Sequence, residues 1–89
     1  MTDKPTARQE LQRILTQIVR GEYPRLGFNS SKPRSFEGTH IGVAMDSIDF
    51  TVYPNDPFKF NGGLIAQVVQ VVGKYGQSGQ YVIKFYYLH

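Results

Sequence analysis

The first clear pattern in the chain is an apolar stripe with the period of an α-helix, opposite a side rich in arginine and glutamine. Its members are Leu11, Ile14, Leu15 and Ile18. Thr6, followed three residues later by Gln9, matches a capping box, which satisfies backbone N–H groups at a helix start. Gly21 is a suitable helix stop. The pattern therefore predicts a helix over residues 6–20.

The longest apolar pattern occupies the C-terminal third of the chain. Apolar residues run from 64 to 72, a Gly-rich stretch follows, and a second run covers residues 81–88. The polar positions of the first run also fit a helix, but its four valines lose rotamer freedom in a helix and favour a strand. We therefore expect two long antiparallel strands joined by a turn at residues 76–79. A helix over residues 64–75 remains the alternative.

This expected hairpin has two apolar faces. The cross-strand pairs that the turn implies are Val68 with Tyr87, Gln70 with Phe85, and Val72 with Ile83. One face of the pair must meet the helix, because a small domain has few other ways to bury apolar groups. The other face must be covered by curvature of the sheet, by a long loop or by another chain.

Two shorter patterns lie between these regions. Apolar residues alternate from 41 to 45 and, after Asp46-Ser47, alternate again from 48 to 52. The change of phase predicts a hairpin over residues 39–53, or else a bulge in one bent strand. Further on, a short strand at residues 58–60 precedes Asn61-Gly62, which predicts a second hairpin with a type I′ turn.

Together these patterns predict an α+β fold, with an N-terminal helix packed on a four- or five-stranded antiparallel sheet. A helical segment at residues 64–75 gives the order α-β-β-α-β instead, and the fold class is unchanged. All 89 residues form one small domain, in which residues 21–38 make a long irregular segment because prolines, glycines and serines break any period.

The composition narrows the classes of protein. The chain contains no cysteine, which excludes disulfides and thiolate zinc sites, so stability must come from packing, with self-association as an additional source. No apolar run reaches the roughly 20 residues that a membrane helix needs, and the N-terminus lacks the apolar core of a signal peptide. We therefore expect a cytoplasmic protein without cofactor, metal or membrane contact.

The net charge of +3 is concentrated in one segment. Residues 20–34 contain four bases and one acid, and the remaining six bases and six acids cancel. Aromatic rings interleave with these cations, as in proteins that stack nucleic-acid bases and bind phosphates. The candidate binding residues are Tyr23, Arg25, Phe28, Lys32, Arg34 and Phe36. The competing interpretation is that the rings fix the loop to the sheet while the cations point to water.

The last expected strand is unusually rich in tyrosine, a residue that tolerates exposure and is enriched where proteins meet. Tyr81, Tyr86 and Tyr87 are therefore candidate interface residues, although a central core strand is the ordinary explanation for such a run.

Catalytic chemistry has weak support in the chain. His40 with Asp46 or Asp49 is the one candidate acid–base pair, and a tight turn at Asp46 would hold His40 away from it. Two histidines are too few for a convincing metal site, and Asn61-Gly62-Gly63 lacks the lysine and spacing of a phosphate-binding loop. We therefore do not expect an enzyme.

The sequence favours a small non-catalytic protein-interaction or regulatory module that binds through its sheet or through residues 21–38, with a homodimer as one form of that interaction. The alternative is a nucleic-acid-binding protein that uses the basic-aromatic loop at residues 20–36. A small enzyme built on His40 ranks last.

Overall fold

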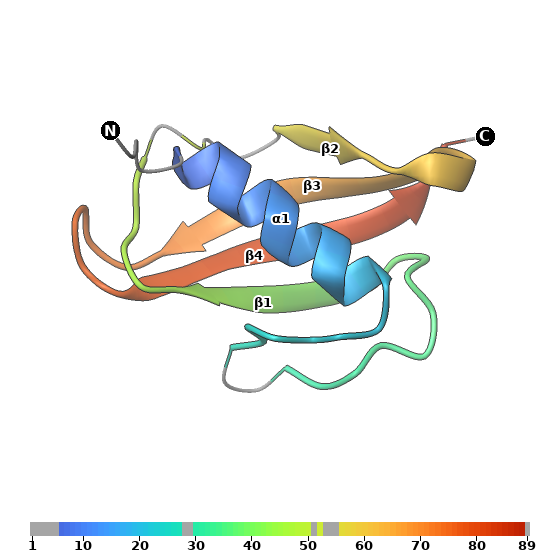
Figure 1. Cartoon of the computed structure of the whole chain (residues 1–89), viewed down its shortest axis with the longest axis horizontal. Coiled ribbons are helices and arrows are strands. Elements are labelled where there is room, and N and C mark those ends of the chain that lie inside the picture. Colours follow the sequence, from blue (N-terminus) through green and yellow to red (C-terminus); the bar gives the residue numbers. More distant parts are fainter. Residues whose placement is uncertain (1–5, 28–29, 51, 53–55, 89) are drawn as a thin grey trace, which may run out of the picture.

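The computed structural model describes residues 6–27, 30–50, 52 and 56–88. Within them the chain forms an α-helix and a four-stranded antiparallel sheet, which confirms the predicted α+β class (Figure 1). The elements are α1 (Ala7–Val19), β1 (His40–Met45), β2 (Pro57–Lys59), the 3-10 turn η1 (Asn61–Gly63), β3 (Leu64–Val72) and β4 (Gly79–Tyr87). The strand order is β1-β4-β3-β2, and α1 crosses one face of the sheet. No helix in these residues is long and apolar enough to cross a membrane.

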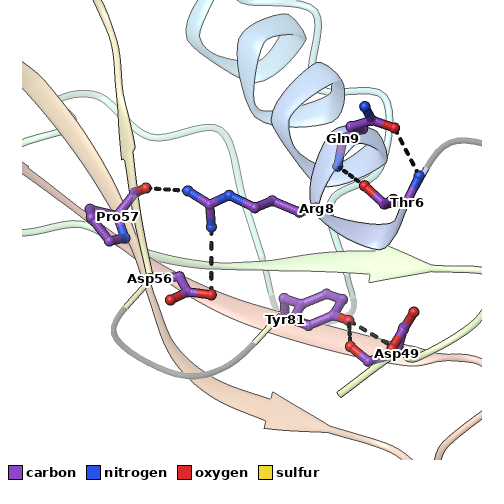
Figure 2. A network of polar contacts seen from close by, with 7 residues as sticks. All are labelled: Thr6, Arg8, Gln9, Asp49, Asp56, Pro57 and Tyr81. Carbon is purple, nitrogen blue, oxygen red and sulfur yellow. Dashed lines mark hydrogen bonds and ion pairs between the residues drawn. The ribbon is translucent and has the colours of Figure 1, made fainter. Parts of the chain in front are cut away.

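Helix α1 begins as the capping box predicts. The Thr6 hydroxyl accepts a hydrogen bond from the Gln9 backbone N–H at 3.1 Å, and the Gln9 side chain accepts one from the Thr6 N–H at 3.0 Å (Figure 2). The four apolar stripe residues are all buried in the main core. The predicted helix is confirmed, and Arg20 serves as its C-cap.

Arg8 ties the first turn of α1 to β2. Its guanidinium donates a hydrogen bond to the Pro57 carbonyl at 2.7 Å and lies 3.5 Å from the Asp56 carboxylate (Figure 2). The same group stands 4.3 Å above the centre of the Phe58 ring. Because Phe58 is buried, this arrangement closes the helix over the short edge strand.

The strand interpretation of residues 64–72 is confirmed, but the expected register was wrong. Val68 lies opposite Ile83, and Val72 lies opposite Gln80. The connection is formed by residues 73–78, earlier than expected, because Ile48 crosses it and exchanges backbone hydrogen bonds with Gly76 and Gln77, at 2.8 Å each. A bulge between Val68 and Gln70 shifts the register once more.

The predicted hairpin over residues 39–53 does not form in the described part of that segment. Strand β1 instead pairs with β4, and after Met45 the chain bends away across the end of the β3–β4 hairpin. Ile48 and Val52 are fully buried and Phe50 is exposed. The alternation in this segment therefore reflects a connection packed on the core rather than a paired strand.

The hairpin at Asn61 does form, between β2 and β3, but without a type I′ turn. The positive φ angles belong to Gly62 and Gly63, at 79° and 80°, and Asn61 is not among the residues with positive φ. The connection between β2 and β3 therefore places its two left-handed residues one position later than the pattern predicts, at the two glycines.

The alternation of side chains along each strand separates the two faces of the sheet. The face under α1 carries the buried strand residues of the main core: Ile41, Val43, Met45, Phe58, Leu64, Ala66, Val68, Tyr81, Ile83 and Phe85. We call the opposite side the open face, because none of the described helices lies on it. Residues 25–27 extend the sheet beside β1: the Gly27 N–H donates to the Gly42 carbonyl at 2.6 Å, and Leu26 bridges to Val43.

Candidate binding face of the sheet

The aromatic rings of the predicted basic-aromatic loop pack inward. Phe36 contacts Phe85 with ring centres 4.9 Å apart, and both Phe36 and Tyr23 pack as half-buried residues against the main core. Phe28 lies outside the described residues. The rings that the structure describes therefore fix the loop to the domain and offer little surface for base stacking.

The cations of this loop are scattered. Arg25 forms an ion pair with Asp46 at 2.9 Å, on the side of the open face. The Lys32 ammonium lies 5.8 Å from the centre of the Tyr23 ring, and Arg34 is exposed. Those of the predicted loop residues that the structure describes are thus not gathered into one surface.

The three candidate interface tyrosines occupy different environments. Tyr81 is fully buried in the core, which removes it from any surface that a partner can contact. Its hydroxyl donates to the Asp49 carbonyl at 2.7 Å and accepts from the Asp49 N–H at 3.1 Å (Figure 2). Tyr86 is half-buried on the open face, whereas Tyr87 lies opposite Leu64 at the margin of the core face.

The pKa of the Tyr81 hydroxyl is raised, chiefly because burial disfavours the charged phenolate. The hydrogen bond to Asp49 acts in the opposite direction, and the negative charges of Asp49 and Glu10 add to the increase. The hydroxyl is therefore a structural tie between β4 and the connection after β1, held in its neutral form at ordinary pH.

The residues considered for catalysis do not meet. His40 begins β1 and Asp46 follows its other end, which separates them by roughly 20 Å along an extended strand. Asp49 contributes its backbone groups to Tyr81. Among the described residues no group of three His, Cys, Asp or Glu side chains is placed to hold a metal ion.

The open face mixes lysine, histidine and glutamine with apolar residues, whereas the core face is apolar. The register aligns His40 with Lys84 and Lys84 with Gln67 in one cross-strand row. The neighbouring row aligns Tyr86 with Ile65, and Ile65 with Lys59 on β2. None of the four strands contains an Asp or Glu, and the Glu37 carboxylate, from the segment before β1, accepts a hydrogen bond from the Tyr87 backbone N–H at 3.0 Å.

Ile65 on the open face is shielded from water although no helix of the described residues covers it. It is buried, yet it is not part of the main core cluster beneath α1. Its direct neighbours across the strands are Tyr86 and Lys59. The apolar stem of a lysine and the ring of a tyrosine can cover such a residue while their polar ends reach solvent.

A pocket of about 630 Å³ lies at one end of the open face. It is lined by residues 24–26, 44–46, 72–73 and 78–80. Its floor follows one row of the sheet, because Ala44 pairs with Gln80 and Gln80 with Val72. Arg25 and Asp46 stand beside this mainly apolar floor, and Val72 is 41% exposed.

Gln80 lies in the floor of the pocket in an unusual way. Its side chain fills the space that a Cβ would need at Gly27 and Gly42, because the amide nitrogen lies 1.6 Å and 2.5 Å from those two positions. The residue is only 8% exposed, and within the described residues its Nε2 has no hydrogen-bond partner. Two glycines on neighbouring segments therefore leave the space that this amide occupies.

The polar rim of the pocket is pre-arranged by a surface ion pair. The Asp46 side chain is 82% exposed, and that of Arg25 is 37% exposed. The Asp46 carbonyl also accepts a hydrogen bond from the Ser78 hydroxyl at 3.2 Å, which ties the rim to the β3–β4 hairpin. Donor and acceptor groups thus stand next to each other with unused hydrogen-bonding capacity.

Sequence reasoning missed the lysines of the open face and most of the pocket. The available signal was that Lys59 and Lys84 each interrupt an apolar strand at a position facing away from the core, with no acid in any strand. Which strands adjoin, and hence that the two lysines share a face, depended on the sheet order. Comparison of the chain with protein-family models, curated proteins and solved structures gives no match, so its function must be argued from its own residues.

Proposed function

We propose that the protein is a non-catalytic binding module that holds single-stranded nucleic acid on the open face of its sheet. The observation that supports this proposal is that Lys84, two residues from the half-buried Tyr86 on β4, and Lys59, across β3 from it, share a face whose strands carry no acid. His40, next to Lys84, adds a further donor.

This arrangement supplies both contacts that single strands require. Lysine ammonium groups bind phosphates and release counterions, and an aromatic ring stacks a base whatever its identity. Lys84 and Tyr86 are two residues apart on β4 and point to the same face, about 7 Å apart along the strand. A base on Tyr86 and an adjacent phosphate on Lys84 can therefore be held together.

The composition of the open face argues against an ordinary protein interface. Cores of protein interfaces are enriched in aromatic residues and depleted in lysine. Here the tyrosines that suggested an interface are divided between the core, the open face and the sheet margin, and only Tyr86 lies among the lysines. The nucleic-acid alternative is thus better supported on the sheet than on the loop at residues 20–36.

The direct test is the affinity for a short oligothymidine, measured by fluorescence anisotropy over a range of salt concentrations. We expect the double variant Lys59→Glu, Lys84→Glu to bind more weakly and to lose about 1.4 units of salt slope, from two contacts at about 0.7 each. Tyr86→Ala should cost about 1–3 kcal/mol of binding free energy.

A matched control separates a specific face from general electrostatics. Arg13→Glu, Arg20→Glu makes the same change in net charge on exposed residues at the helix. Lys32→Glu, Arg34→Glu does so on the loop. If all three double variants weaken binding equally, the sheet is not the binding site. If the loop pair alone abolishes binding, the site belongs to residues 20–36.

A protein-interaction module is the second candidate, supported by a different observation. Phe50 and Tyr75 stack with ring centres 6.3 Å apart and are 41% and 71% exposed. Exposed aromatic pairs are typical anchors of protein interfaces. The solution mass at low and high salt tests its homodimeric form. A salt-resistant dimer that Tyr75→Ser converts to a monomer supports this form, and a monomer throughout removes it.

A further inference from the structure

We infer that the pocket at residues 24–26, 44–46, 72–73 and 78–80 receives one base of the bound strand and selects guanine. The inference rests on the proposed function, because the pocket lies on the open face that would carry the strand. It adds a sequence preference that lysine contacts and base stacking alone do not provide.

The position of the pocket suits a strand that follows β4. The pocket row passes through Gln80, four residues and about 14 Å along β4 from Lys84. Every second residue of β4 points to this face: Gln80, Val82, Lys84 and Tyr86. A chain with a base on Tyr86 and a phosphate on Lys84 can therefore continue toward the pocket.

The shape of the pocket suits a flat aromatic ligand. Its volume of about 630 Å³ is within the range of small-molecule sites. The floor at Ala44 and Val72 is apolar, and Val72 remains exposed. A base lying on this floor would cover apolar surface that is open to water in the free protein, as bases do when they leave a single strand for a protein pocket.

The rim of the pocket matches the hydrogen-bonding edge of guanine. Guanine presents O6 and N7 as acceptors and the N1–H and N2–H groups as donors. The Asp46 carboxylate can accept from the two donors, while Arg25 can donate to O6 or N7. Because these side chains are already held 2.9 Å apart by their ion pair, acceptor and donor are adjacent before a ligand arrives.

Among the four bases, guanine alone presents two adjacent donors and an acceptor on one edge. Adenine offers its N6 amino group as the only donor, beside the ring acceptors N1 and N7, so it can accept from Arg25 but cannot give the Asp46 carboxylate the two adjacent donors that guanine supplies. Pyrimidines are smaller and cover less of the apolar floor. A well-formed bidentate contact of this type discriminates between bases by about tenfold or more.

The experiment uses guanosine monophosphate and adenosine monophosphate as probes, with amide NMR spectra of the whole chain. We expect guanosine monophosphate to shift the amides of Ala44, Gly73 and Gly79 and to bind about tenfold more tightly than adenosine monophosphate. Asp46→Asn should remove this preference because it replaces an acceptor oxygen with a donor. Glu22→Gln makes the same change in charge away from the pocket and should leave the preference intact.

Oligonucleotides then separate this inference from the proposed function. If oligothymidine binds the open face and the addition of one guanine brings no gain in affinity, the pocket does not select guanine, and the inference fails alone. If guanosine monophosphate binds as expected but oligothymidine does not bind, the proposed strand function fails. Equal affinity for the two monophosphates, or a guanine preference unchanged in Asp46→Asn, also overturns the inference.

Discussion

The two faces of the sheet come from the same strands and differ in almost every physical property. The face beneath α1 is formed by buried apolar residues such as Ile83 and Phe85, whereas the open face presents Lys84 and Tyr86 from the same strand. Because side chains alternate along a strand, neighbouring residues on β4 serve opposite purposes. The comparison teaches that stability and recognition can be divided residue by residue within one strand.

The division is not complete, and the exceptions occur at one end of the sheet. Gln80 is buried on the open face, and the next residue, Tyr81, carries a hydroxyl into the core. Each polar group needs its own accommodation there. The Gln80 amide fits because Gly27 and Gly42 have no side chains. The Tyr81 hydroxyl is satisfied by hydrogen bonds with the backbone N–H and carbonyl of Asp49.

The sharpest test of the division is a pair of truncations one residue apart. Phe85→Ala removes a fully buried ring and should cost about 3–5 kcal/mol of unfolding free energy, because a cavity remains in the core. Lys84→Ala, on the open face, should change stability by about 0.5 kcal/mol or less. Chemical denaturation measures both. Similar losses for the two variants would show that the open face is itself a second core.

The second test concerns the space that Gln80 occupies. Gly27→Ala places a methyl group on the amide of Gln80 and should destabilise the domain by about 1–3 kcal/mol, as overpacking does. The double variant Gly27→Ala, Gln80→Ala removes the conflict and should recover part of the loss. Gly21→Ala is a less useful control, because its positive φ adds strain of a different origin. A loss that Gln80→Ala does not relieve would show that the backbone at Gly27, rather than the amide, is responsible.

The smallest expected effect concerns the polar tip within the core. Tyr81→Phe leaves the carbonyl and N–H of Asp49 without the hydroxyl and should cost about 1–2 kcal/mol. Its pH dependence is diagnostic. Because burial raises the pKa of folded Tyr81 above the unfolded value of 10.0, the folded state holds the proton more tightly. Stability from this group is complete below about pH 10 and falls as pH rises further.

Thermal unfolding at rising alkaline pH measures this effect directly. Tyr81→Phe should show a smaller loss of stability above pH 10 than the natural chain, since it cannot ionise there. The other described tyrosines are present in both proteins, so their ionisation contributes equally to the two curves. Parallel curves for the two proteins would mean that the hydroxyl of Tyr81 does not ionise on unfolding in that range.

Helix α1 and the strand character of β3 could be predicted because each depends on the residue types and spacing within one short segment. The apolar stripe and capping box of α1 lie within one stretch of the chain, and the valines of β3 favour a strand whatever lies beside them. The register between β3 and β4 could not be predicted. It depends on a bulge beside Val68 and on the backbone of Ile48, a residue far from the turn in sequence, which holds residues 76 and 77.

The same distinction explains the candidate site. Composition identified a basic and aromatic loop, but the direction of its rings depends on contacts such as that of Phe36 with Phe85, which no local pattern reveals. Lys59 and Lys84 lie on the same face because β3 pairs with both β2 and β4 and fixes the register of the two strands. The basic-aromatic loop could therefore be identified from the sequence, whereas the residues that share the open face could not.

The sequence by itself determined the α+β class, the helix, the strand character of its C-terminal third, and the positions where polar residues interrupt apolar runs. Those features follow from periodicity and backbone preference, which act over a few residues. Only the tertiary structure decided that β1 pairs with β4, that Tyr81 lies in the core, and that Arg25 meets Asp46 beside Gln80. These outcomes depend on which distant segments can bury their apolar faces together, and that is a property of the whole chain.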